Sequence, residues 1–333
     1  MLDWILKNIC TNEVDETILA VNHLAEILKE RVGNKRSGIK IHYSLEPEPL
    51  GTGGPLKKVE DRLSNGTTFL TTNGDILAEV PLKEMLDLHK DEGALATVAL
   101  HEVKDPRRFG VAEFDKEMRI KRFFEKPRTN KIMSRWINAG IYLMEPRILK
   151  YIPARKRVSL EKEVFPTLSK EGKLFGFKLK GSWYDVGTIE TFSKANYKLI
   201  RNESKQEPLL HDSVDIEKGA NLIPPLVIRE NCKVCSSSII GPNSAISQDS
   251  YIGKKSIVKN SIIFENVKIG QLTKIEESII GGNVEIGDNV QIGRGCVISD
   301  YVTIRNNLKI SKGVTIHPYK EIEDDVKRPG HIL

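Results

Sequence analysis

The chain has 333 residues, of which 39% are hydrophobic and 29% charged, and its formal net charge is +6. This length suffices for two domains that each bury a core, while the absence of a long apolar run and of a Lys/Arg stripe with interleaved aromatics argues against membrane spans and nucleic-acid binding. The excess of positive charge suits small, phosphate-rich substrates.

The opening segment MLDWILKNIC has apolar residues at helical spacing, so a helix begins almost at residue 1. Asp3 and Lys7 interrupt its apolar character, so the segment does not resemble a signal peptide. We therefore expect a cytoplasmic protein.

Patterns typical of strands and helices then alternate to about residue 200. Alternating and β-branched runs predict strands at 14–21, 38–46, 67–75, 94–103, 109–115, 119–125 and 136–145. Leucine spacing and capping residues predict helices at 23–32, 81–93, 158–172 and 189–202, with Ser159 capping the third. The alternation predicts an α/β, Rossmann-like domain over residues 1–200, with a mixed, mainly parallel sheet.

A polar segment at 201–222 is expected to be a linker, and a new pattern follows it. Aliphatic residues recur at every sixth position in three runs separated by steps of five: Ile240, Ile246, Ile252 and Val258; Ile263, Ile269 and Ile275; and Ile280, Ile286, Ile292, Ile298, Ile304, Ile310 and Ile316. This period predicts a left-handed parallel β-helix of hexapeptide repeats over 223–320, with a C-terminal tail at 321–333. Each aliphatic side chain should point inward and stack on the one a full coil away.

The chain has four cysteines, too few for a disulfide scaffold. Cys232 and Cys235 form one CxxC pair, but no second pair or nearby histidine completes the four ligands of a zinc site. We expect these two cysteines to be buried small residues.

Two glycine-containing segments suggest nucleotide and metal binding. In LGTGG, Gly51 and Gly53 let a backbone approach a ligand closely, although the spacing is neither a P-loop nor a dinucleotide fingerprint and a structural turn would look the same. In TTNGD, Asp75 follows an apolar strand, where α/β sheets place ligands, and a carboxylate there can hold Mg²⁺. The alternative is a tight turn at Asn73 and Gly74.

Three further segments carry polar residues at strand ends. In FFEKP, Glu125 and Lys126 suit a sugar hydroxyl and a phosphate, or form an exposed pair before a proline. INAG places Asn138 beside two small residues, which suits a ligand on the backbone or close strand packing. WYDVGT supplies a second carboxylate, Asp185.

Taken in order, NGD, FGV, EKP, NAG and WxDxGT, followed by a hexapeptide solenoid, resemble the sugar-1-phosphate nucleotidyltransferase family over nearly the whole chain. The segments VSLEKEVFP and EPLGTGG are most similar to those of mannose-1-phosphate guanylyltransferases. Glucose-1-phosphate uridylyl- and thymidylyltransferases are the nearest neighbours.

The resemblance implies that a sugar-1-phosphate oxygen attacks the α-phosphate of an NTP, most simply mannose 1-phosphate and GTP, and that catalysis is positioning and charge neutralisation. It implies that Asp75 and Asp185 hold Mg²⁺ and that Lys126 contacts the sugar phosphate. The implied nucleotide-binding residues are Leu50, Gly51, Thr52, Gly53, Asn73 and Gly74. The implied sugar-binding residues are Gly110, Glu125, Asn138, Ala139 and Gly140. We expect the β-helix to assemble a homo-oligomer or carry a regulatory contact.

Members of this family begin with a strand, a GGxGTRLRP-type loop and a Lys-Pro pair, whereas MLDWILKN aligns with the helix that follows them. Without that strand, two strands would have an unpaired edge. The sequence therefore suggests that Met1 is an internal methionine.

Alternative functions are a non-catalytic, NDP-sugar-binding regulatory paralogue, or an NDP-sugar synthase that uses UTP or dTTP with glucose 1-phosphate. A solenoid acyltransferase is disfavoured because no histidine lies between Cys232 and Thr315.

Overall fold

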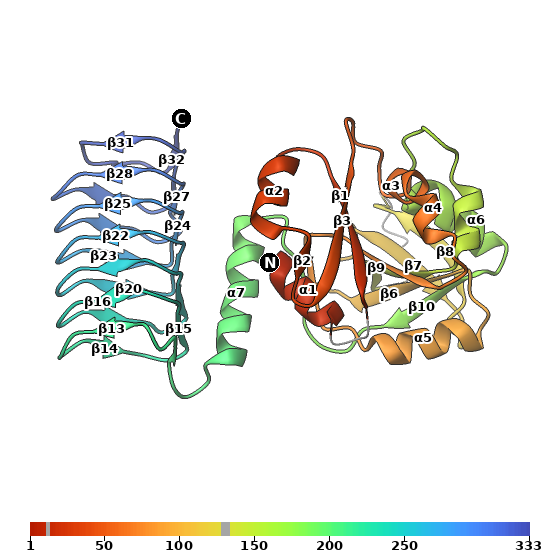
Figure 1. Ribbon diagram of the computed structural model, residues 1–333, viewed down its shortest axis with the longest axis horizontal. Helices are drawn as coiled ribbons and strands as arrows, with labels where there is room; N and C mark the ends of the chain where they lie inside the picture. Colours follow the sequence, from red (N-terminus) through yellow and green to blue (C-terminus); the bar gives the residue numbers. More distant parts are fainter. Residues whose placement is uncertain (11–13, 128–133) are drawn as a thin grey trace. The chain divides into compact units, whose positions relative to one another are not determined.

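The computed structural model describes residues 1–10, 14–127 and 134–333. The chain divides into two compact units, Met1–Gly187 and Thr188–Leu333 (Figure 1). No helix in the described residues is long and apolar enough to cross a membrane.

The first unit contains the strands and helices that the sequence predicts up to residue 187, with ends shifted by a few residues, whereas the helix predicted at 189–202 lies in the second unit. Its helices are α1 (Leu2–Cys10), α2 (Ala25–Val32), α3 (Gly54–Lys58), α4 (Glu60–Leu63), α5 (Leu82–Asp91), the short helices η1 (Pro146–Tyr151) and η2 (Leu160–Val164), and α6 (Phe165–Lys170). Its strands are β1 (Glu16–Val21), β2 (Lys35–Arg36), β3 (Ile39–Leu45), β4 (Phe69–Thr72), β5 (Ile76–Ala78), β6 (Ala96–Glu102), β7 (Gly110–Phe114), β8 (Ile120–Glu125), β9 (Trp136–Met144), β10 (Leu174–Lys178) and β11 (Trp183–Asp185). The predicted cap is present, because the Ser159 side chain accepts a hydrogen bond from the Lys162 amide.

The main sheet of this unit is mixed, as predicted, but it is not mainly parallel. Its strand order is β10-β6-β9-β7-β8, and β4 also pairs with β9. In the described part of the unit, only the β1–β3 and β6–β10 pairs are parallel. The prediction was wrong on this point because β9 runs against β4, β6 and β7, and because β7 and β8 form an antiparallel pair without a crossover helix.

Helices cover both faces of this sheet. Side chains alternate along a strand, so neighbours on β6 serve different cores. Val98 and Leu100 belong to a buried cluster that includes Phe165 of α6. Ala99 belongs to a second cluster, with Met85 of α5. The result is a three-layer α/β architecture.

A smaller sheet, of order β1-β3-β2, lies apart from the main sheet in the described chain. Leu6 of α1 packs with Ile39 and Ile41 of β3. Within the described residues, β1 pairs only with β3 and β4 only with β9, so each has one unpaired edge. A cavity of about 480 Å³ is lined by residues of α1, β4 and β5, among them Trp4 and Thr72.

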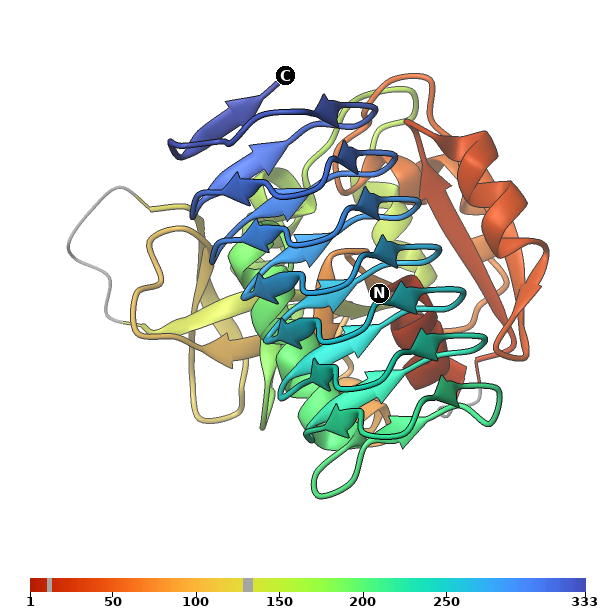
Figure 2. The same cartoon turned by 90° about the vertical axis from the view of Figure 1, so that its left-hand side faces the viewer.

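The second unit is a parallel β-helix with one long helix, α7 (Ile189–Glu203). Figure 2 shows its coils stacked one on another. One sheet contains β12 (Leu209–Leu210), β15 (Leu226–Ile228), β18 (Ser244–Ile246), β21 (Ile262–Ile263), β24 (Ile279–Ile280), β27 (Val297–Ile298), β30 (Val314–Ile316) and β32 (Gly330–Ile332). A second contains β13 (Asp215–Ile216), β16 (Lys233–Val234), β19 (Tyr251–Ile252), β22 (Lys268–Ile269), β25 (Glu285–Ile286), β28 (Thr303–Ile304) and β31 (Glu321–Ile322). The third contains β14 (Asn221–Leu222), β17 (Ile239–Ile240), β20 (Ile257–Lys259), β23 (Lys274–Glu276), β26 (Gln291–Ile292) and β29 (Lys309–Ile310).

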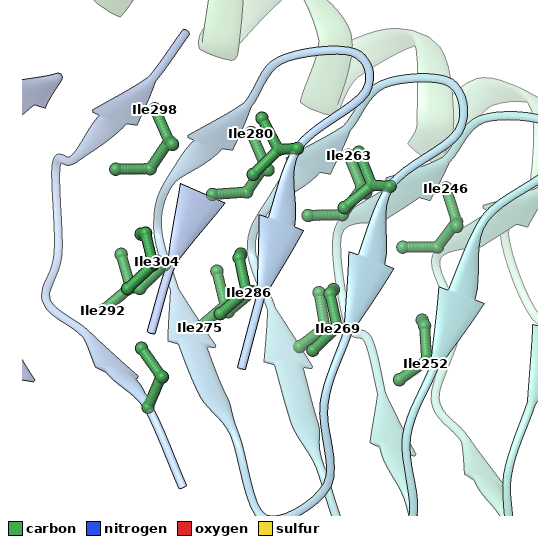
Figure 3. Packing of buried hydrophobic residues seen from close by; sticks show 14 of the residues in the cluster. Ile246, Ile252, Ile263, Ile269, Ile275, Ile280, Ile286, Ile292, Ile298 and Ile304 are labelled. Atoms are coloured by element: carbon green, nitrogen blue, oxygen red, sulfur yellow. The ribbon is translucent and has the colours of Figure 1, made fainter. Parts of the chain in front are cut away.

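The predicted stacking of every sixth aliphatic residue is confirmed. Ile263 pairs in register with Ile246 and Ile280, and all three are buried in one continuous core (Figure 3). The steps of five in the sequence do not break the stack, because they produce coils that are one residue shorter. Burying about one Ile or Val per strand supplies the hydrophobic stabilisation of the β-helix.

Buried hydroxyl groups replace aliphatic residues at some inward positions. The Thr273 hydroxyl accepts a hydrogen bond from the Val290 amide (3.1 Å) and donates one to the Gly287 carbonyl (2.8 Å). Ser250 has the same pair of contacts with the Val267 amide and the Phe264 carbonyl. Because each hydroxyl is satisfied by the next coil, its burial is not costly.

The segment 201–222, expected to be a linker, instead carries the end of α7 and the strands β12–β14. Leu210 and Leu222 pack against the core of the β-helix. Similarly, the expected tail at 321–333 carries β31 and β32. The six-residue period in fact continues through both segments, at Leu210, Ile216 and Leu222 and at Ile322, so the β-helix extends further at each end than predicted. The expectation for Cys232 and Cys235 is confirmed, since both are buried free thiols.

Candidate functional site

The glycine-rich loop at residues 50–53 is held by the chain itself. The Gly53 amide donates to the Val158 carbonyl and the Val158 amide donates to the Leu50 carbonyl, both at 2.9 Å. Gly51 has a φ of +77°, and a Cβ there would overlap the Val158 carbonyl oxygen. These glycines therefore permit a close approach of two backbone segments, which was the structural alternative for this motif.

Thr52 joins this loop to a buried carboxylate. Its hydroxyl donates to Glu161 Oε2 (2.6 Å) and accepts from the Leu160 amide (2.9 Å). Glu161 also accepts from the Ser159 hydroxyl (2.7 Å) and from the phenol of the buried Tyr142 (3.2 Å). Glu161 was not among the predicted site residues, although it lies in the quoted segment VSLEKEVFP.

The Asn138–Gly140 segment lies on β9, beside Tyr142. Asn138 donates to the Tyr142 phenol and accepts from the Gly140 amide, both at 2.9 Å. Gly140 has a φ of +73°, and a Cβ there would lie 2.8 Å from Asn73 Nδ2. The Asn73 amide donates to the Gly140 carbonyl (2.9 Å), so the NGD and NAG segments are in direct contact.

Glu125 lies at the end of β8, opposite Gly110 on β7. A Cβ on Gly110 would lie 2.9 Å from Glu125 Oε2 and 3.3 Å from Asn138 Cβ, so the three residues surround one point. Burial raises the pKa of Glu125, and the nearby Glu161 charge raises it further. Lys126 follows with a φ of +46° and a largely exposed side chain, its Nζ 4.0 Å from Glu125 Oε1.

The two predicted metal ligands lie close together. Asp185 ends β11, which pairs antiparallel with β5, and the Val186 amide donates to the Asp75 carbonyl (2.8 Å). Burial raises the pKa of Asp185, the Asp75 charge raises it further, and Lys126 partly opposes this. Two carboxylates that repel each other suit a divalent cation, because it would neutralise both charges.

In the described residues, no cluster of three or more His, Cys, Asp or Glu side chains could hold a metal by itself. Two protein carboxylates are nevertheless enough for Mg²⁺, which usually keeps several waters and binds substrate phosphates. The donor set therefore fits a metal that is bound together with a nucleotide.

Trp183 connects the carboxylate pair to β9. Its indole Nε1 donates to the Ala139 carbonyl (2.9 Å), and its ring stacks on His101 with centroids 5.4 Å apart. Phe109 meets the same ring edge-on at 5.6 Å. Trp183 lies in the quoted WYDVGT segment but was not predicted as a site residue.

Comparison with known proteins now identifies the family. The model described as "Nucleotidyl transferase" matches residues 1–202, and the model described as "GMPPB C-terminal domain" matches residues 209–332. The chain belongs to the nucleotidyl transferase family. Enzymes of this family generally use a divalent metal ion, which agrees with the carboxylate pair.

Among curated relatives of this nucleotidyl transferase, the mannose-1-phosphate guanyltransferase of Saccharomyces cerevisiae is 35% identical over 225 residues, covering 66% of this chain and 60% of that protein. The mannose-1-phosphate guanylyltransferase catalytic subunit beta of Xenopus tropicalis is 34% identical over 224 residues, covering 66% and 61%. The matches thus span about six-tenths of the length of these relatives.

Among solved structures, HddC from Yersinia pseudotuberculosis has a TM-score of 0.52 and 25% identity, covering 60% of this chain and 84% of that chain. Its complex with GMP-PN has a TM-score of 0.51 and 26% identity, with the same coverage. The predicted family resemblance and the predicted order of an α/β domain before a β-helix are confirmed.

Most residues predicted for the nucleotidyl transferase site form one connected arrangement. Contacts run from Thr52 through Glu161 and Tyr142 to Asn138. Gly110 lies between Asn138 and Glu125, because a Cβ there would meet both side chains. Gly74 differs, because a Cβ added there would meet no described atom within 4 Å. Gly74 therefore faces open space, and packing alone does not explain its identity.

Proposed function

We propose that this nucleotidyl transferase converts GTP and mannose 1-phosphate to GDP-mannose and pyrophosphate. The observation that carries the proposal is the carboxylate pair, Asp75 and Asp185, whose mutual repulsion is partly offset by Lys126. The names of its relatives support mannose 1-phosphate and a guanine nucleotide, and a bound GMP-PN in one structural neighbour supports a nucleotide in this fold.

In the proposed reaction, an oxygen of mannose 1-phosphate attacks the α-phosphorus of GTP, a new P–O bond forms, and the bond to the β-phosphate oxygen breaks. Pyrophosphate leaves with the bonding electrons. Asp75 and Asp185 would hold Mg²⁺, which when bound supplies neutralisation of phosphate charge. Lys126 would contact the sugar phosphate with its exposed ammonium group.

The remaining residues of the site would bind and orient the two substrates. We assign the nucleotide to the loop residues Leu50, Gly51, Thr52 and Gly53 and to Asn73 and Gly74. We assign the sugar to Gly110, Glu125, Asn138, Ala139 and Gly140. The raised pKa of Glu125 reflects burial, and a sugar hydroxyl is a hydrogen-bond partner that such a carboxyl can take. Holding both substrates in line would supply much of the rate.

We also propose that the chain forms a homo-oligomer, with the β-helix as the assembling element. The strands at each end of the solenoid sheets have an unpaired edge in the described chain, and exposed coil ends favour packing against another copy. Analytical ultracentrifugation would test this, and a monomer at all concentrations would contradict it.

The catalytic proposal is tested by following pyrophosphate release with Mg²⁺, mannose 1-phosphate or glucose 1-phosphate, and each of GTP, UTP and dTTP. We expect the highest kcat/KM with GTP and mannose 1-phosphate, and a loss of at least about 100-fold in Asp185→Asn, which removes a metal ligand. The control Asp212→Asn changes an exposed carboxylate of the β-helix unit and should leave the rate unchanged. Binding of GDP-mannose without turnover would favour the regulatory alternative instead.

A further inference from the structure

A hollow of about 350 Å³ lies on the third sheet of the β-helix, over β23, β26 and β29. Its lining is dominated by positive charge. The cationic residues that line it are Lys274, Arg294, Lys309, Lys312 and Lys327. Glu276 is the single acidic residue among those that line it.

Most of this positive charge is not neutralised. Glu276 is already shared by Lys274 (3.1 Å) and Arg294 (3.7 Å). The side-chain Nζ atoms of Lys309, Lys312 and Lys327 have no carboxylate oxygen within 4.0 Å among the residues that the structure describes, although Asp325 accepts a hydrogen bond from the Lys309 backbone amide (2.8 Å). Three ammonium groups therefore border one hollow without forming an ion pair.

Elsewhere on the solenoid, charges one coil apart have opposite signs. Lys268 pairs with Glu285 in the next coil at 2.7 Å, and Lys233 pairs with Asp215 at 3.3 Å. In the hollow, by contrast, the register places Lys274 and Lys309 on either side of Gln291, with no acidic residue in the column. The column therefore offers Lys309 no acidic partner on the adjacent strand.

The corner of the coil beside the hollow also differs from several other corners, because it lacks an acidic or amide side chain that accepts a backbone hydrogen bond. After three other Ile-Gly pairs, an Asp or Asn of the following coil accepts a hydrogen bond from the next backbone amide, as Asp288 does from Gln271 and Asp300 from Gly282, both at 2.8 Å. After Ile252-Gly253, the Lys254 amide has no such acceptor among the described residues. Arg294 follows Ile292-Gly293, but there Lys312 adjoins Gly293, and a lysine cannot accept. No acceptor for the Arg294 amide is found among the described residues.

We propose that this hollow binds a small anion with at least two phosphoryl groups, of which pyrophosphate is the simplest. Its cations and its open backbone amide match phosphoryl oxygens, and its volume lies at the lower end for small-molecule sites. None of the lining residues is aromatic, so nothing there would stack on a nucleobase. The site lies wholly within the β-helix and does not depend on the proposed catalytic function.

The test is titration calorimetry with sodium pyrophosphate in buffer with EDTA, so that metal-dependent binding at the carboxylate pair is suppressed. The test variant is Lys309→Gln/Lys312→Gln/Lys327→Gln. The matched control, Lys233→Gln/Lys268→Gln, removes lysines that are paired on another sheet. We expect the test variant to bind about tenfold more weakly or worse, and the control to bind as the parent chain does. Lys126→Gln should also bind pyrophosphate with the affinity of the parent chain.

Thermal unfolding supplies a second readout that also reports folding. Pyrophosphate should raise the melting temperature of the parent chain and not that of the test variant. Without anion, the test variant should melt at about the temperature of the parent, because the three substituted ammonium groups form no ion pair that would be lost. The proposal is overturned if the parent shows no binding at about 1 mM pyrophosphate, if the test variant binds as tightly as the parent, or if the control loses affinity equally.

Discussion

The β-helix and the candidate site are built from contacts of very different reach. In the β-helix, almost every stabilising contact joins a residue to its counterpart one coil away, as Ile263 with Ile246 and Ile280. In the site, Thr52 meets Glu161 across 109 positions of sequence, and Trp183 meets Ala139 across 44. A repeated local pattern therefore determines the first region, whereas the second depends on the fold as a whole.

The isoleucine stack gives the most direct test of whether contacts between neighbouring coils stabilise the β-helix. Ile280→Ala removes a fully buried side chain between two neighbouring coils and should cost about 2–5 kcal/mol in the free energy of unfolding. Ile279→Ala is the matched control, because Ile279 lies on the same strand but is only partly buried, and should cost clearly less. Urea denaturation measures both. Equal losses would mean that the stack is not the principal source of stability.

In the candidate site, the loss of a single contact between residues distant in sequence should lower activity. Glu161→Gln keeps the shape of the side chain but weakens its acceptance of hydrogen bonds from Thr52 and Tyr142. Charge-assisted hydrogen bonds are worth about 1.5–3 kcal/mol, so we expect kcat/KM for pyrophosphate release to fall roughly 10- to 100-fold.

Because Glu161 joins the loop to β9, its replacement should affect the KM for both substrates. Thr52→Val removes one contact of the same network and should have a smaller effect, while Thr52→Ser retains the hydroxyl and should restore most of the activity. A change confined to the sugar KM would show that Glu161 acts only on the sugar side.

The same difference in reach explains what could be predicted from the sequence. The inward face of the solenoid could be predicted from the sequence, because each inward aliphatic residue has the same surroundings as the one a coil away. Asp75 and Asp185 could be predicted as metal ligands because each ends a recognisable strand motif, and these roles stay predictions. Glu161 was not, because its role appears only once Thr52 and Tyr142, distant in sequence, converge on it.

One glycine motif and one chain segment show what a local pattern does not reveal. Gly51 approaches the Val158 backbone closely, which the motif did not indicate, and its predicted contact with a nucleotide stays a prediction. The segment 201–222 was expected to be a linker because it is largely polar, but Leu210, Ile216 and Leu222 continue the six-residue period and lie on β12–β14, which pair with the next coil. The contacts of Gly51 and of these strands both involve partners that a local window does not include.

The buried residue His89 makes contacts of intermediate sequence separation, and its titration makes the stability of the fold depend on pH. His89 at the end of α5 is 1% exposed, contacts the Thr97 hydroxyl at 2.7 Å and lies 3.2 Å from Glu145 Oε1. Burial lowers the pKa of His89, although Glu145 partly opposes the shift. The folded-state pKa is thus below the unfolded value of about 6.5.

The unfolded chain therefore takes up this proton first as the pH falls. The contribution of neutral His89 to stability is complete above about pH 6.5 and declines below it, by up to about 1.4 kcal/mol for each unit of pKa shift. Urea denaturation between pH 5 and 8 should show this decline in the parent chain, and His89→Gln should show a shallower one. Identical slopes would assign the pH dependence to other groups.

The smallest effect that we predict separates backbone from side chain within the repeated region. Asn283 has a φ of +58° at a corner of the β-helix, and its side chain accepts a hydrogen bond from Asn266 Nδ2 at 2.7 Å. Asn283→Ala should cost about 1–2 kcal/mol, because alanine tolerates the left-handed conformation poorly and also removes the amide contact. Asn283→Gly permits that conformation and removes only the contact, so its cost should be well below that of alanine. If glycine and alanine cost the same, the amide contact between coils, and not the left-handed corner, is what selects asparagine there.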